Sequence, residues 1–475
     1  MYRRNRIHSL SILLSVVKHA STLFPLYLIF LFKFRDSLPF SILMNTIIFS
    51  LVPLFILTFI AWMRWYRFTY TITEEQVILE QGWLNKKRKY IPKERIQAIH
   101  ESQNIIHRLF GLTELQIDTA GSREGAEIVL QIITKEEASH IQGQLSERRR
   151  MIQEDIAVLP IFTLSNKKTF LYAATSGSIG FVFSVLLGIY TEIDEYVSIH
   201  FKLENFQSQT PSFYGEVAIA VLTAGWLLGT LLVYQKYHGF TVVKQKDELV
   251  ITRGLFEKKK LIVPLDRIQA IKVEENIIRQ WLGYATIRFV SASSSSKEEE
   301  YAGFRLVCFP LVKRSHIPYL LQRYFPDYRA PSSFQHLPKR SFERYMIRVI
   351  VPVLLFIAIT LSQTSMVKYV APIFLIVGAI LGYRRYYDAR WCITGEQLTV
   401  IYRRIGRITV YTKKSHIQAL TVSKTVLQES ASLCNVKICV KSGAGNMTFR
   451  IKDADDTVGT SLRRWYSYEK ESDFA

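Results

Sequence analysis

The sequence predicts an α+β membrane protein with three transmembrane helical hairpins, each followed by an antiparallel β domain that ends in a closing helix. The first observation is a motif that occurs three times, as RIQAI at 95–99, RIQAI at 267–271 and HIQAL at 416–420. The second is that each motif lies in a polar block where apolar and polar residues alternate, a pattern typical of half-buried strands. The third is that a pair of long apolar stretches precedes each block. Such a repeat predicts three copies of one structural unit.

The apolar stretches predict the helical hairpins. A membrane-spanning helix needs about 20 apolar residues. The second, third and fourth stretches meet this requirement, whereas the others are shorter or interrupted. The six stretches cover residues 21–34, 40–65, 170–190, 217–234, 346–361 and 369–383.

The segment before the first stretch has a different character. Residues 8–19 place most of their apolar side chains on one helical face, with Lys18 largely off it. This pattern predicts a helix that lies in the membrane interface. A cleaved signal peptide is the alternative, because the chain starts with basic residues. No small-residue cleavage site follows, however, and a second apolar stretch comes at once.

The charge distribution predicts the topology. The formal net charge of +21 is compatible with nucleic acid or with an anionic membrane surface as a partner. We favour the membrane because Lys and Arg are spread over positions that flank the apolar stretches. The expected outer loop at 191–216 is acidic, and the other two hold only Lys33, Arg35 and Lys368 as basic residues. The positive-inside rule then places both termini and all three β domains in the cytoplasm.

The three polar blocks fix the expected domain boundaries. Residues 75–99, 247–271 and 396–420 align without gaps. The expected parts are the interfacial helix with the first hairpin (1–66), the first β domain (67–165), the second hairpin (166–236), the second β domain (237–343), the third hairpin (344–386) and the third β domain (387–475).

The third block diverges from the others because it lacks two shared glycines. Ser432 stands where the other blocks have Gly111 and Gly283, and Arg403 replaces the glycine that is Gly82 in the first block. Glycine adopts positive φ without steric cost. If the glycines hold positive φ, the third block is expected to turn differently at both places.

These residues carry a family resemblance. The pattern G-x-[LF], P-x-x-R-I-Q-A-I, N-I-I-x-x-x-x-G after an apolar hairpin resembles the bacterial PH-like (YdbS/YdbT-type) membrane protein family. Three units in one chain resemble its larger, YdbT-type members. The resemblance implies a PH-like fold, a strongly bent antiparallel sheet closed by a C-terminal helix, in a bacterial cell membrane. It also implies a link to envelope stress or antimicrobial resistance, and a small single-domain family member as a partner subunit.

Basic clusters are the best functional candidates. They are Lys86, Lys87, Arg88 and Lys89 in the first block, Lys258, Lys259 and Lys260 in the second, and Arg403, Arg404, Arg407, Lys413 and Lys414 in the third. A cluster near the inner leaflet gains roughly 1 kcal/mol per Lys or Arg from anionic lipid. The alternative is a solvated strand edge whose charge deters aggregation.

The repeated motif offers a second candidate surface. Its polar members are Arg95, Gln97, Arg267, Gln269, His416 and Gln418. They form either an interaction surface or, as we favour, a structural element whose Ile and Ala residues point inward.

Motifs for catalysis, cofactors or metals are not evident. The sequence contains no Walker loop, no nucleophile elbow and no HExxH helix. The four cysteines are not spaced as zinc ligands or as a redox pair. Asp453 and Asp455 resemble the start of a calcium loop, but Val458 and Arg464 stand where that loop needs Gly and Glu. We therefore expect this acidic run to be an exposed loop.

Together these patterns predict a non-enzymatic integral membrane protein without a cofactor. Its three cytoplasmic PH-like domains would bind protein or anionic lipid of the inner leaflet, in envelope integrity or in resistance to membrane-active compounds. Nucleic acid is not expected as a partner. The alternative function is a transporter or flippase that exports a toxic amphiphile.

Overall fold

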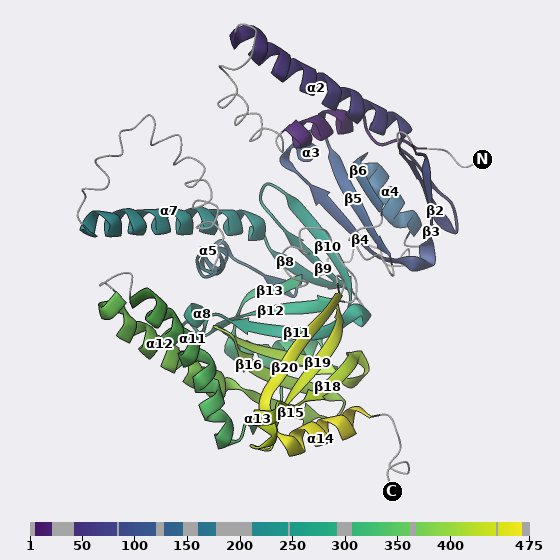
Figure 1. Ribbon diagram of the computed structural model, residues 1–475. Coiled ribbons are helices and arrows are strands. Elements are labelled where there is room, and N and C mark those ends of the chain that lie inside the picture. The colour runs from purple at the N-terminus through teal and green to yellow at the C-terminus, as the bar shows by residue number, and fades with distance from the viewer. Residues whose placement is uncertain are drawn as a thin grey trace. The chain divides into compact units, whose positions relative to one another are not determined.

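The computed structural model describes residues 5–20, 42–82, 85–119, 128–145, 160–176, 211–245, 248–291, 306–361, 367–442 and 445–467. The chain divides into two compact units, which are described separately. The first comprises residues 1–159 and 256–263, with 295–297, and the second contains the remainder. Figure 1 labels their helices and strands.

The first unit contains the first β domain. Strands β1 (Thr69–Ile72), β2 (Gln76–Gln81) and β3 (Lys87–Pro92) form one antiparallel sheet. Strands β4 (Ile96–Gln103), β5 (Leu112–Thr119) and β6 (Ile128–Thr134) form a second group of antiparallel neighbours.

The first unit also contains helices on either side of these strands. Helix α2 (Ile42–Arg67) precedes β1, and α3 (Ile105–Leu109) connects β4 to β5. Helix α4 (Lys135–Leu145) follows β6 and turns Ala138 and Ile141 into the core, while Glu136 and Glu137 stabilise its first turn.

The second unit begins with the strands and helices of the second repeat. Strands β7 (Phe162–Thr163), β8 (Thr241–Gln245) and β9 (Glu248–Arg253) pair antiparallel in that order. Strands β11 (Ile268–Glu275), β12 (Tyr284–Ser291) and β13 (Leu306–Lys313) form the second group. The helices are α5 (Asn166–Ala174), α7 (Pro211–Tyr237), α8 (Ile277–Trp281) and the closing helix α10 (Ile317–Tyr324).

The third repeat follows a helical hairpin in the same unit. Helices α11 (Phe342–Leu361) and α12 (Val367–Asp388) contact each other along the hairpin (Figure 1). The strands are β14 (Gln335–His336), β15 (Arg390–Thr394), β16 (Gln397–Arg403) and β17 (Arg407–Lys413), then β18 (Ile417–Ser423), β19 (Leu433–Ser442) and β20 (Gly445–Asp455). Short helix α13 (Val426–Glu429) precedes β19, and closing helix α14 (Asp456–Tyr466) follows β20.

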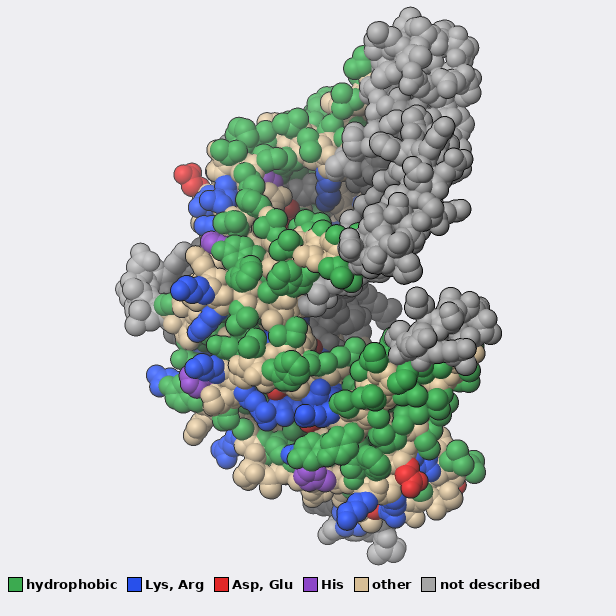
Figure 2. Space-filling model, turned by 90° about the vertical axis from the view of Figure 1, so that its left-hand side faces the viewer, with side chains coloured by type: hydrophobic (Ala, Val, Ile, Leu, Met, Phe, Trp, Pro, Cys, Tyr) green, Lys and Arg blue, Asp and Glu red, His purple; other side chains and the backbone are tan. Residues whose placement is uncertain are grey.

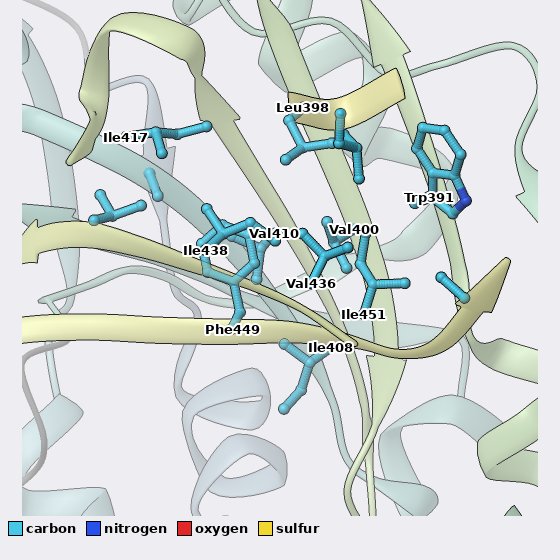
Figure 3. Close-up of a cluster of buried hydrophobic side chains, with 14 of the residues drawn as sticks. Trp391, Leu398, Val400, Ile408, Val410, Ile417, Val436, Ile438, Phe449 and Ile451 are labelled. Carbon is cyan, nitrogen blue, oxygen red and sulfur yellow. The ribbon is translucent and has the colours of Figure 1, made fainter. Parts of the chain in front are cut away.

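The third repeat has a core between its two groups of strands. Val400 and Val410 come from β16 and β17, whereas Val436, Ile438 and Phe449 come from β19 and β20. Figure 3 shows these side chains directed toward one another across the space between the strands. Two groups of antiparallel strands with a closing helix occur in all three repeats, so the prediction of three PH-like β domains is confirmed.

The prediction of three transmembrane hairpins is wrong. Among the described residues, one helical segment, Ile219–Tyr237, has the length and apolar character required to cross a membrane. Helix α11 carries Glu343, Arg344 and Arg348 near its start, and α12 carries Arg384 and Arg385 near its end, which shortens their apolar parts. Helices α11 and α12 do form a hairpin, but neither meets the length and apolar character of a membrane-spanning helix within the described residues.

Several expected segments lie outside the described residues. These are the first apolar stretch at 21–34, most of the third at 170–190, the first outer loop with Lys33 and Arg35, and residues 191–210 of the second outer loop. The expected helix at 8–19 is present as Leu10–Ala20, with Val16 buried while Leu13 and Val17 are exposed. Its placement in a membrane interface stays a prediction.

The third repeat keeps one of the two glycine turns without the glycine. Gly111 and Gly283 have φ of 65° and 70°, and Ser432 adopts φ of 49° at the equivalent place. The expectation of a different turn is therefore wrong there, because serine accepts the left-handed conformation at a steric cost. At the other position Gly82 has φ of 117°. Arg403 does not have a positive φ and is the last residue of β16, so the third repeat does differ there.

Candidate functional site

A basic pocket lies between the third hairpin and the third β domain. Its cavity volume is about 440 Å³. Six of its lining side chains are cationic and none is a carboxylate. The lining residues are Tyr345, Arg348, Arg385, Tyr402, Arg403, Arg404, Thr448, Phe449, Arg450 and Lys452.

Helices α11 and α12 supply one wall of this pocket. Tyr345 and Arg348 are three residues apart on α11 and therefore share a helix face. The Tyr345 hydroxyl donates a hydrogen bond to the Lys452 carbonyl over 3.2 Å. The Arg385 Nε on α12 donates to the Arg404 carbonyl over 2.9 Å. These bonds tie both helices to the strands of the third repeat.

Two of the arginines are held by buried carboxylates. Arg348 makes a bidentate ion pair with Asp453, in which Nη2 lies 3.0 Å from Oδ1, and Asp453 is fully buried. The Arg403 Nε lies 2.5 Å from the Asp388 Oδ2, and both side chains are nearly buried. Arg403 also donates to the Gln280 Oε1 over 2.9 Å. These ion pairs hold the two arginine side chains in fixed positions in the pocket wall.

Three of the four remaining cations are exposed and are not neutralised within the described residues. Among the residues that the structure describes, Arg404, Arg450 and Lys452 make no ion pair, and all three are exposed at the pocket. Burial, and then the charges of Arg348 and Arg450, lower the pKa of Lys452. Three positive charges that repel each other in one pocket favour an anion between them.

The chemistry of the lining suits a phosphate group. Guanidinium groups match phosphate oxygens in a bidentate geometry, and a lysine adds a compact charge. The Thr448 hydroxyl is a further donor in the lining. Tyr345, Tyr402 and Phe449 give the pocket aromatic walls. The pocket can therefore bind an anionic group that carries an apolar part.

An apolar surface adjoins the basic residues. Exposed side chains on α11 include Leu355, Phe356 and Ile359, and those on α12 include Ile376 and Ile380. Figure 2 shows Lys and Arg side chains gathered directly beside hydrophobic side chains on one face of the molecule. Contiguous exposed apolar surface of this kind marks contact with a membrane, a ligand or a partner.

Only part of the predicted third cluster reaches this pocket. Arg403 and Arg404 line it, but Arg407 pairs with Glu275 on β11 at 2.5 Å. Lys413 pairs with Asp327 at 2.7 Å, and Lys414 lies over the Trp465 ring at 6.0 Å from its centroid.

The other two predicted clusters lie on strands of the first unit. Lys86 and Arg88, near and on β3, pair with Glu80 at 3.3 and 3.0 Å. Lys87 and Lys89 are also on β3. The second cluster, Lys258, Lys259 and Lys260, belongs to β10 (Lys258–Pro264), which pairs antiparallel with β4. That cluster is therefore part of a sheet.

The repeated motif has a structural position in each repeat. Arg95, Arg267 and His416 end short 3-10 turns that lead into β4, β11 and β18. Arg267 lies 3.6 Å from Asp266. The Gln269 carbonyl is 3.2 Å from the Nδ1 of His416, whose pKa is lowered mainly by burial.

The glutamines of the motif differ among the repeats. The Gln269 side chain is half-buried and that of Gln418 is exposed on β18, whereas the Gln97 side chain lies outside the described residues. The motif Ile268 and Ala270 are buried. None of these motif residues lines the basic pocket.

The acidic run of the third repeat differs from the expectation. Asp453 is fully buried and has φ of 51°, so it is not part of an exposed loop. Sequence reasoning also missed Arg348, Arg385 and Lys452 as pocket residues. Arg348 and Arg385 lie on helices that precede the β domain, and the short charged run around Lys452 has no distinctive spacing.

Comparison with known proteins gives consistent results. A family model described as "Bacterial PH domain" matches residues 14–149, 183–322 and 347–470. The chain is also 30% identical over 426 residues to "UPF0699 transmembrane protein YdbT" of Bacillus subtilis (strain 168), and the match covers 86% of each chain. Each family match includes one copy of the repeated motif, at 95–99, 267–271 or 416–420. The chain therefore belongs to the bacterial PH domain family and contains three copies of that domain.

Proposed function

We propose that this chain is a non-enzymatic bacterial membrane protein whose third PH-like domain binds the phosphate of an anionic lipid in the basic pocket. The observation that supports this function is the set of three cations, Arg404, Arg450 and Lys452, that have no carboxylate partner in the described structure. The apolar surface of α11 and α12 beside them suits an acyl chain. The relative from Bacillus subtilis is named a transmembrane protein, which supports a membrane location for this chain.

The membrane anchor that we propose is α7. Its segment Ile219–Tyr237 is apolar and is mostly unburied within the molecule. Lys236 follows near the end of the helix, and a basic residue at that end favours a cytoplasmic location for the domain that follows. We propose that α7 enters the membrane from its Lys236 end without carrying the first domain across, because β4 of that domain pairs with β10. The PH-like domains would then face the anionic inner leaflet from the cytoplasm.

The test compares lipid retention by full-length variants. The protein is purified into nanodiscs of phosphatidylcholine with a minor fraction of phosphatidylglycerol, and native mass spectrometry counts bound anionic lipid. Substituting Arg404→Glu, Arg450→Glu and Lys452→Glu removes three attractive charges of about 1 kcal/mol each. We expect the affinity for phosphatidylglycerol to fall by on the order of 100-fold.

A matched control separates the pocket from general surface charge. Lys441→Glu, Arg463→Glu and Arg464→Glu make the same charge change in the same repeat, at exposed residues outside the pocket. We expect this variant to retain most of its anionic lipid. Equal losses from both triple variants would show a diffuse electrostatic attraction and would refute the pocket. Displacement of the lipid by inorganic phosphate alone would identify a soluble phosphate compound as the ligand.

Two further parts of the function stay proposals. A small single-domain family member as a subunit, and a role in envelope integrity or in resistance to membrane-active compounds, follow from the family resemblance. Export of a toxic amphiphile is the alternative function. Counterflow of a fluorescent amphiphile in proteoliposomes distinguishes it, because a lipid-binding scaffold produces no net movement.

A further inference from the structure

The PH-like repeats join one another through strands, and the pattern is the same each time. In the second unit, β11 of the second repeat pairs antiparallel with β17 of the third, so that one sheet runs in the order β13-β12-β11-β17-β16-β15-β14. In the first unit, β4 of the first repeat pairs antiparallel with β10. Each time, the strand that carries the repeated motif receives the third strand of the following repeat.

The register of the two junctions is also the same. In the first junction Lys258 lies opposite Gln103, and in the second Arg407 lies opposite Glu275. Lys258 and Arg407 are equivalent positions in the repeat, as are Gln103 and Glu275. Because both junctions have the same register, it predicts which residues would lie opposite each other if a third junction formed.

Strand β18 is the equivalent strand of the third repeat, and its outer edge is open. In the described structure β18 pairs with β19 alone, in a sheet of order β18-β19-β20. Its Ala419, Thr421 and Ser423 are exposed, whereas the equivalent positions of β11 are buried at Ala270 and Lys272 and half-buried at Glu274. An exposed strand edge offers a row of unpaired backbone groups to another strand.

The charges of the paired residues at the end of each junction determine which strand fits this edge. Arg407 makes an ion pair with Glu275, with its Nη2 2.5 Å from the Oε1. The third repeat has Lys424 at the position of Glu275. In the same register an incoming strand would therefore need a carboxylate opposite Lys424. It would also need an apolar residue opposite Leu420, where Tyr411 faces Ile271 in the existing junction.

A second copy of this chain does not satisfy that requirement. Its equivalent strand is β3, which would place Lys86 opposite Lys424 and bring Lys87, Arg88 and Lys89 alongside. Like charges directly opposite each other destabilise a strand pair. We propose that the β18 edge binds the third strand of a PH-like domain on a separate polypeptide, with an acidic residue opposite Lys424. This proposal does not depend on the lipid pocket.

Photocrosslinking in cells tests the proposed edge. A photoreactive amino acid replaces Thr421 in the full-length chain. A separate control variant carries it in place of Thr460, on the exposed surface of α14. We expect an adduct from position 421 and none from position 460. Mass spectrometry should locate the crosslink in a strand of a PH-like domain of another protein. An adduct with the Lys86–Lys89 region of a second copy would overturn the proposal. So would an adduct with an unrelated protein, or no adduct.

The charge opposite the incoming strand provides an independent readout. Lys424→Glu should lower the yield of the same adduct by on the order of fivefold, since attraction becomes repulsion. Lys424→Arg keeps the charge and should keep the yield. Lys424 is exposed and pairs with Asp456 at 2.7 Å, so its substitution leaves the core intact, and a thermal melt checks this. An unchanged yield from Lys424→Glu would contradict the predicted register.

Discussion

Removal of the Arg348 side chain should release helix α11 from the third β domain. Asp453 is fully buried and accepts hydrogen bonds from the Arg348 guanidinium and, over 2.7 Å, from the Gln428 Nε2. Loss of one partner of a buried pair costs about 3–5 kcal/mol. The Arg348 side chain is 39% exposed, so water reduces the cost, and we expect about 2–3 kcal/mol for Arg348→Ala.

Hydrogen exchange of the full-length protein measures this loss locally. Amides in β20 and α13 should exchange roughly 50-fold faster in Arg348→Ala, since 1.4 kcal/mol corresponds to about a factor of ten. Arg344→Ala is the control and is compared at the β20 amides, because the one hydrogen bond of Arg344 within the described residues goes to the Leu427 carbonyl of α13. The double variant Arg348→Ala with Asp453→Ala should be less destabilised than the sum of both single variants, by at least about 1 kcal/mol. Strictly additive effects would refute the reasoning.

Three other predictions concern single positions. Because burial and neighbouring guanidinium groups lower the pKa of Lys452, binding of phosphatidylglycerol should weaken as pH rises through that lowered pKa, and Lys452→Arg should abolish the decrease in a titration of lipid binding. Ser432→Gly should stabilise the third repeat by about 1 kcal/mol in thermal or denaturant unfolding, since φ is positive there, and Gly283→Ser should destabilise the second. Gly82→Ala should destabilise the first unit by at least about 2 kcal/mol, because its Cβ would lie 1.9 Å from the Asn85 carbonyl oxygen; normal stability of that variant would mean that the turn rearranges freely.

The β domains were predictable because their information is local. Alternating apolar residues, together with the glycines at 111 and 283, mark strands and turns within a few residues of the chain. The motif, which occurs as RIQAI twice and as HIQAL once, predicted that three such domains are present. The left-handed turn at Ser432 shows that the fold can keep a conformation after the residue that favours it has changed.

The pocket and the junctions were not predictable for a common reason. Arg348 reaches Asp453 and Arg403 reaches Asp388 only after the helices have packed on the third repeat. Pairing of β11 with β17 joins two domains whose separate patterns give no sign of it. The prediction of a third transmembrane hairpin failed because charged residues bound the apolar parts of α11 and α12, and several of them bind the β domain.

The most direct test of the account is electron cryomicroscopy of the full-length protein in nanodiscs that contain phosphatidylglycerol. The account predicts density for a phosphate group within hydrogen-bond distance of Arg404, Arg450 and Lys452, with an acyl chain along the apolar surface of α11 and α12. A pocket without lipid density, with these side chains turned into solvent, would contradict the proposed function.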